Sequence, residues 1–179
     1  MGNMIFSAAL TVFLLAVNAP LRAETPTAYF MPIEFLVGHC WAGPFPDGKA
    51  IDTHCFEWML VRNFIRDRHR VKGNAPDYLG ETIYFRDSAA NKIAFRYWNT
   101  DGGISDGTLN ADAKNILLFE EVYRGQDGKE LKFQTEMERM GETQYQVRTR
   151  SWDGKSWIDA WAVTFTRVNS DIPGAGSEK

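Results

Sequence analysis

The chain has 179 residues, of which 20 are Lys or Arg and 23 are Asp or Glu, so its formal net charge is −3. Acidic and basic residues are interspersed, which gives no basis for expecting nucleic acid or an anionic membrane surface as a partner. The length suits one domain that can bury a real core.

The N-terminal segment has the layout of a cleaved secretory signal. An apolar run from Ile5 to Val17 precedes the segment Asn-Ala-Pro-Leu-Arg-Ala, which ends at the small residue Ala23, and polar residues follow. A run this short is typical of a signal core rather than a membrane span. We therefore expect a signal peptide over residues 1–23, a periplasmic or secreted protein, and no stable membrane anchor after cleavage. A retained anchor is the alternative, because no Lys or Arg precedes the run.

The chain contains two cysteines, Cys40 and Cys55, on either side of a Pro-Asp-Gly turn at residues 46–48. They would face each other if the flanking segments form an antiparallel hairpin. Directly opposed cysteines can form a cross-strand disulfide, and a lone pair in a secreted chain favours a structural bridge over a redox pair. The same register predicts three further opposed pairs: Trp41 with His54, His39 with Phe56, and Val37 with Trp58.

Beyond residue 30, apolar and polar residues alternate with a period of two, and turn signals recur at short intervals. This pattern predicts about ten strands, near 35–43, 49–60, 63–72, 80–86, 92–99, 104–111, 115–124, 129–140, 143–152 and 156–167. We expect an all-β domain over residues 24–168, an up-and-down antiparallel barrel, because closure removes exposed strand edges. A sandwich is the alternative. Residues 27–34 are expected to form a short helix or an extended lid over one end, and residues 169–179 a disordered tail.

The alternation also predicts which side chains point inward. In the third strand, Arg66, Arg68 and the next two cations of that face suit solvent, so Asp67 and His69 are expected to face the interior. All three histidines, together with Asp52 and Asp67, would then line one cavity. In the last strand, one face is expected to carry Trp157, Trp161, Val163 and Phe165.

Residues 35–43, Phe-Leu-Val-Gly-His-Cys-Trp-Ala-Gly, resemble the first strand of the lipocalin-like barrels of the calycin superfamily. Arg167 resembles the arginine that packs over the strand-one tryptophan of that family. Residues 78–87 and 95–107 look like a secreted bacterial group of the superfamily without assigned function. The resemblance implies structural roles for Gly38 and Arg167. The family tryptophan stands two residues after the glycine, whereas Trp41 stands three after it, so Cys40 occupies the family position.

The resemblance implies an internal cavity for a small, often apolar molecule. A ten-strand barrel also has more interior than side chains readily fill. We expect binding of a small, largely apolar ligand by Trp41, His54, His69, Tyr84, Tyr97, Phe133, Tyr145 and Trp161. Plain core packing explains the same aromatic residues if the barrel is filled, which would indicate a structural or interaction protein of the envelope.

A metal- or haem-dependent site, catalytic or sensory, on the barrel histidines is a further alternative, because imidazole ligates zinc, copper and haem iron. The related nitrobindins bind haem through a histidine near the C-terminus, but this chain has no histidine after His69. There is no His-x-His spacing and no Gly-x-Ser-x-Gly motif. We therefore assign no metal, cofactor or catalytic residue, and an enzyme is the less favoured class.

Overall fold

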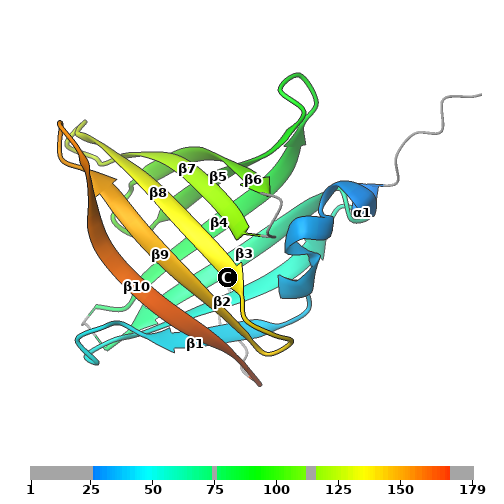
Figure 1. The fold of residues 1–179 in the computed structure, drawn as a ribbon, viewed down its shortest axis with the longest axis horizontal. Coiled ribbons are helices and arrows are strands. Elements are labelled where there is room, and N and C mark those ends of the chain that lie inside the picture. The colour runs from blue at the N-terminus through cyan, green and yellow to red at the C-terminus, as the bar shows by residue number, and fades with distance from the viewer. Residues whose placement is uncertain (1–25, 74–75, 112–115, 170–179) are drawn as a thin grey trace, which may run out of the picture.

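The computed structural model describes residues 26–73, 76–111 and 116–169. The expected signal peptide, and the expected tail beyond residue 169, lie outside these described residues. Ten strands form one closed barrel in which every strand pairs antiparallel with the next one along the chain, and β1 closes the ring by pairing with β10 (Figure 1). The predicted all-β, up-and-down barrel is therefore confirmed, and the sandwich is excluded.

Two short helices precede the strands, α1 (Pro26–Tyr29) and the 3-10 helix η1 (Met31–Leu36). Within the described part of the chain, no helix has the length and apolar character needed to cross a membrane. The strands are β1 (Cys40–Pro44), β2 (Ile51–Met59), β3 (Phe64–Lys72), β4 (Tyr78–Asp87), β5 (Lys92–Asn99), β6 (Ile104–Ala111), β7 (Ile116–Arg124), β8 (Glu130–Arg139), β9 (Gln144–Trp152) and β10 (Trp157–Val168).

The first strand is shorter than predicted, because the chain from Met31 to Leu36 is helical rather than extended. Gly38 has a φ of 80°, a left-handed conformation that interrupts the strand before Cys40. Val37 consequently forms an isolated parallel bridge with Phe56, so its predicted pairing with Trp58 is wrong. From Cys40 onward the predicted register holds, with Cys40 opposite Cys55 and Trp41 opposite His54.

The two cysteines are joined by a disulfide, as their opposed positions predicted. The bond links β1 to β2 at the point where the chain leaves η1 and enters the barrel. It therefore holds the register that turns Trp41 inward, where its side chain is fully buried.

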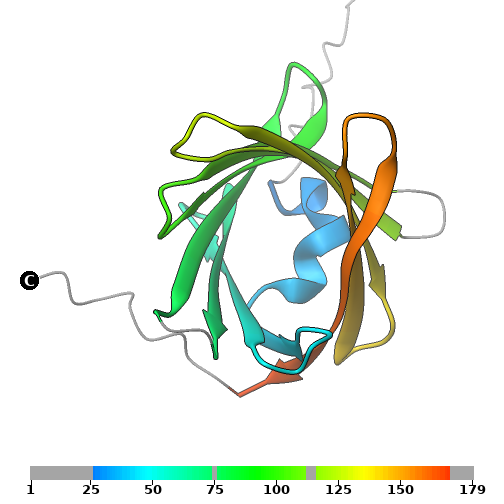
Figure 2. The ribbon, with the colours of Figure 1, turned by 90° about the vertical axis from the view of Figure 1, so that its left-hand side faces the viewer.

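One end of the barrel is covered by the helical segment, as expected for residues 27–34 (Figure 2). Phe30, Ile33 and Leu36 are each 1% exposed and belong to the hydrophobic core. The Trp41 indole Nε1 donates to the Leu36 carbonyl at 3.1 Å, which fastens η1 to the first strand. The opposite end carries the β1–β2, β3–β4, β5–β6, β7–β8 and β9–β10 connections and has no such cover among the described residues.

The last strand carries a bulge that corrects one predicted face. The pairing of β10 with β9 shifts between Asp159 and Trp161, so two β10 residues oppose one β9 residue there. Before the shift the even-numbered residues of β10 face inward, and after it the odd-numbered residues do. Trp161 therefore lies on the inner face while Trp157 does not, and Trp157 packs against Trp152 at a ring distance of 5.4 Å.

Candidate functional site

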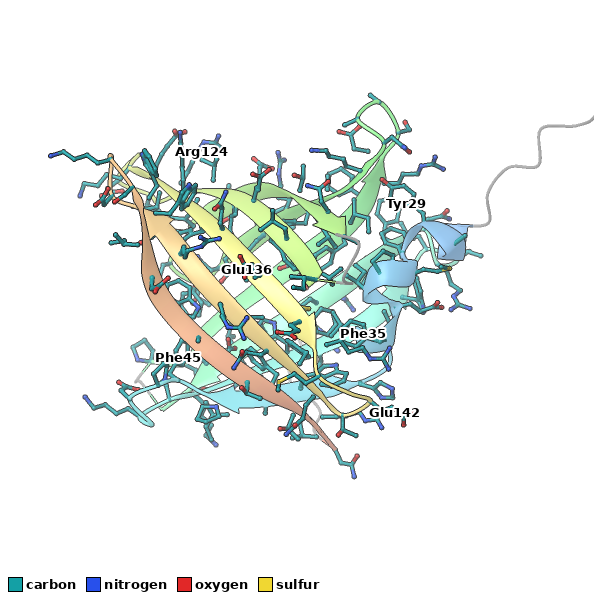
Figure 3. All side chains as sticks on the ribbon, viewed as in Figure 1. Tyr29, Phe35, Phe45, Arg124, Glu136 and Glu142 are labelled. Atoms are coloured by element: carbon teal, nitrogen blue, oxygen red, sulfur yellow. A yellow bond between two sulfur atoms is a disulfide. The ribbon has the colours of Figure 1, made fainter. Side chains whose placement is uncertain are left out.

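A cavity of about 460 Å³ occupies the barrel interior. It reaches the end opposite the helices, where partly exposed side chains such as Leu131 and Trp161 line it. Phe45 also lines it and lies at that end, far from Tyr29 of α1 and Phe35 of η1 (Figure 3). The cavity is thus closed by the core at the helical end and accessible from the loop end, which we term the mouth.

Most of the predicted ligand-binding residues line this cavity. The structure brings seven of the eight together: His54, His69, Tyr84, Tyr97, Phe133, Tyr145 and Trp161. They come from β2, β3, β4, β5, β8, β9 and β10, and alternation places each of them on the inner face of its strand.

Trp41 is the predicted residue that does not line the cavity. It points inward but lies within the core near the helical end, edge-on to Phe35 and Tyr145 at ring distances of 6.0 and 5.2 Å. Arg167 is its cross-strand partner on β10. The guanidinium of Arg167 lies 3.1 Å from His39 Nε2, and the guanidinium groups that cover aromatic rings in the described residues belong to Arg62, Arg86 and Arg139.

One wall of the cavity carries a histidine held between two carboxylates. His54 Nδ1 lies 2.7 Å from Asp67 Oδ2, and His54 Nε2 lies 3.1 Å from Asp52 Oδ2. A neutral imidazole has one donor and one acceptor nitrogen, and an ionised carboxylate only accepts. Both hydrogen bonds are therefore satisfied together when His54 is an imidazolium and donates to each aspartate.

Electrostatics favour the same protonation state. Burial acts to lower the pKa of His54, but the two carboxylates raise it well above its usual 6.5. Burial likewise acts to raise the pKa of Asp52, yet the charge and hydrogen bond of His54, with His69 nearby, hold it well below its usual 3.8. An imidazolium of His54 therefore stands between the carboxyl groups of Asp52 and Asp67, and Asp52 is ionised.

A second polar chain continues from this group along the cavity wall. His69 Nδ1 lies 3.2 Å from Asp52 Oδ1, although the two atoms do not have hydrogen-bond geometry. On the other side of the ring, His69 Nε2 lies 3.2 Å from the Tyr97 hydroxyl, which lies 2.7 Å from that of Tyr78. Burial raises the pKa of Tyr97 far above 10.0, so this phenol keeps its proton.

A glycine makes the approach of these rings possible. Gly80 on β4 is paired with His69, and a Cβ atom at this position would collide with the Tyr97 ring and lie 2.7 Å from His69 Cδ2. The missing side chain lets Tyr97 reach across β4 to the histidine.

The opposite wall carries a single carboxylate. In the ring of ten strands, β7 is five positions from β2 in either direction, so Glu121 on β7 stands across the cavity from His54. Its Oε1 accepts a hydrogen bond of 2.5 Å from the Ser105 hydroxyl. Burial raises the pKa of Glu121, and no cationic side chain pairs with it among the described residues.

Glu121 and Ser105 were not among the predicted site residues. The signal was present, because Leu117, Phe119 and Glu121 share the inner parity of β7. His39, in contrast, was expected in the cavity and is an exposed residue beside Arg167. It precedes β1, where the turn at Gly38 removes it from the alternation that places His54 and His69 inward.

No family model matches the chain, and no curated protein matches it at a significant level.

Proposed function

We propose that the protein binds a small, largely apolar molecule inside its barrel. The observation that supports this function is the cavity of about 460 Å³, a typical size for a small-molecule site, with aromatic walls and a few convergent polar groups. Access is from the mouth, since the helices and the core close the other end.

A neutral apolar fluorophore, N-phenyl-1-naphthylamine, tests the proposal directly. We expect saturable binding of one molecule per protein, with quenching of Trp161 because this indole lines the cavity. Thr135→Phe, which places a phenyl ring inside the cavity, should weaken binding. Gln134→Phe adds the same ring on the outer face of β8 and should leave binding unchanged. Equal binding by both variants would contradict the proposal.

We further infer that the chain is a lipocalin-like protein of the calycin superfamily. Support comes from the closed up-and-down barrel, from the burial of Trp41 in the first strand, and from the short helix over one end. The offset between Gly38 and Trp41 is accommodated by the turn at Gly38, which precedes the strand.

We also propose that the protein is exported and loses its first 23 residues. The disulfide between Cys40 and Cys55 supports this location, because such bonds persist in oxidising compartments. Intact mass measurement of protein recovered from the periplasm or medium should give a chain that begins at Glu24. A chain that keeps residues 1–23 would contradict the proposal.

A divalent metal site on the same wall is the second candidate function. The observation that favours it is that one ligand atom each from Asp52, His54 and His69 lies within 4.8 Å of the others. Asp67 binds Nδ1 of His54 and Tyr97 binds Nε2 of His69, which is how metal-binding histidines are usually oriented. The ion would displace the proton that His54 Nε2 donates to Asp52, because a metal ligand needs an unprotonated imidazole nitrogen. A small ion would also provide a partner for the buried atoms Asp52 Oδ1 and His69 Nδ1.

Calorimetric titration of chelator-treated protein with zinc tests this candidate. We expect one ion per chain, no binding by His69→Gln, and affinity reduced about 10- to 100-fold by Asp67→Asn. His39→Gln is the matched control, since His39 lies outside the cavity. Absence of zinc binding, or equal loss in both histidine variants, would exclude the site.

A further inference from the structure

The charged residues that line the cavity are strongly biased toward negative charge. Three carboxylates line it, those of Asp52, Asp67 and Glu121, together with the imidazoles of His54 and His69. No Lys or Arg is among the lining residues that the structure describes. An acidic cavity with low-dielectric walls attracts a cationic ligand and repels an anionic one.

The carboxylates on the two walls differ in the charge of the group that hydrogen-bonds to them. Asp52 and Asp67 each accept a hydrogen bond from His54, and the remaining oxygen of each is buried without a hydrogen-bond partner. Glu121 accepts one hydrogen bond, from a neutral hydroxyl. Glu121 is therefore the cavity carboxylate that lacks a positive charge beside it.

Aromatic rings surround Glu121. Phe119 and Tyr123 flank it on the inner face of β7, and Phe133 is its partner on β8. Gly107 is its partner on β6, and a Cβ atom there would collide with the ring of Phe95, so this ring covers the backbone beside Glu121. A carboxylate among aromatic rings is a favourable environment for an ammonium group, because the face of such a ring attracts cations.

We propose that the cavity takes a small apolar molecule that carries a protonated amine, whose ammonium group pairs with Glu121. This inference rests on the proposed ligand-binding function and specifies the chemical class of the ligand. The apolar part packs against the aromatic walls between Glu121 and the mouth. Asp52 and Asp67, across the cavity, are already paired with His54, so Glu121 is the carboxylate left to pair with the amine.

The burial of Glu121 also favours its pairing with an ammonium group. An ionised carboxylate without a cationic partner is costly in a buried site, which is why the pKa of Glu121 is raised. A bound ammonium group offsets this cost. An uncharged ligand does not, so the cavity discriminates between an amine and its neutral isostere.

Three probes of matched size measure the discrimination: 4-phenylbutylamine, 4-phenylbutanol and 4-phenylbutanoic acid. Each is titrated into the chelator-treated chain at neutral pH, in displacement of N-phenyl-1-naphthylamine. We expect the amine to bind at least about tenfold more tightly than the alcohol, as for hydrogen bonds to a charged group, and the acid to bind least.

Two variants test whether Glu121 causes the preference for the amine over the alcohol. Glu121→Gln keeps the shape and the hydrogen bond from Ser105, and should reduce the preference for the amine over the alcohol to less than about threefold. Glu120→Gln, on the outer face of the same strand, should keep the preference. If Glu121→Gln does not fold, the carboxyl carbon shift of Glu121 in the unaltered chain decides, since it should move with the amine and not with the alcohol.

The outcomes separate this inference from the proposed function. If the alcohol binds as tightly as the amine, or Glu121→Gln keeps the preference, the amine inference is overturned while ligand binding stands. The same holds if only N-phenyl-1-naphthylamine binds. If neither that fluorophore nor any of the three probes binds, the ligand-binding function itself is overturned.

Discussion

The two ends of the barrel are built from similar aromatic residues but in opposite ways. At the helical end, Trp41 is fully buried and donates its indole hydrogen to Leu36. At the mouth, Trp161 is 41% exposed and borders the cavity. The first tryptophan has all of its surface covered by protein, whereas the second has surface left for a ligand.

This difference predicts that stability depends mainly on the helical end and the proposed ligand binding on the mouth. Packing at the helical end, the disulfide and η1 hold the register of β1, on which closure with β10 depends. The cavity walls nearer the mouth can then keep unfilled space and polar groups that a packed core would not tolerate. Substitutions at the two ends should consequently affect different properties.

The largest difference is expected between the two tryptophans. Trp41→Ala should lower the free energy of unfolding by about 3–5 kcal/mol, because it leaves a large cavity in the core. Trp161→Ala should cost about 1 kcal/mol or less but abolish the fluorescence response to N-phenyl-1-naphthylamine. Urea denaturation of both variants measures this difference, and similar losses of stability would contradict the proposed difference between the two ends.

Substitution of Asp67, which pairs with His54, is expected to cause the next largest loss of stability. Asp67→Asn removes one partner of a buried ion pair and should lower stability by about 3 kcal/mol. The control is Glu136→Gln, which breaks the half-exposed pair between Glu136 and Arg150 and should cost less than about 1 kcal/mol. Equal losses of stability in urea denaturation would show that the buried pair contributes no more than the half-exposed pair.

Removal of the disulfide should have a smaller but clear effect. Cys40→Ser with Cys55→Ser frees a loop with a sequence separation of 15 residues, for which chain entropy predicts a loss of about 2–3 kcal/mol. The variant should still fold and still bind the fluorophore, because the cavity lies nearer the mouth. Loss of binding in the folded variant would contradict the separation of the two ends.

The pH dependence of stability should be modest and should depend on His54. Its raised pKa means that its contribution is fully present below pH 6.5 and is lost as the pH rises through the folded-state value. Asp52, with a lowered pKa, contributes above pH 3.8 and loses this only in stronger acid. The urea midpoint should therefore decrease as the pH rises above 6.5. His54→Gln should flatten this fall, whereas His39→Gln should keep it.

Strand order and most inward-facing residues could be predicted from the sequence, because alternation with a period of two is a local property. The pairing of Cys40 with Cys55 followed from their positions about one turn. A short helix was one of two expectations for residues 27–34, but its continuation to Leu36 could not be predicted in this way, since it depends on the turn at Gly38 and on the contact between Trp41 and Leu36. The bulge before Trp161 was not predicted either, because a single extra residue in a strand has no distinct signal in the sequence.

The polar site was only partly predictable for a related reason. Alternation placed His54 and His69 inward, but the hydrogen bonds of His54 to two aspartates depend on the register of β2 with β3. Glu121 stands on a strand far away in sequence, and only closure of the barrel brings it opposite His54.

A crystal structure of the protein with 4-phenylbutylamine tests the central claim most directly. The account predicts one molecule inside the barrel, with its nitrogen within hydrogen-bond distance of the Glu121 carboxylate and its phenyl ring against the aromatic wall toward Trp161. An interior filled by protein side chains, or an amine bound only on the outer surface, would contradict it.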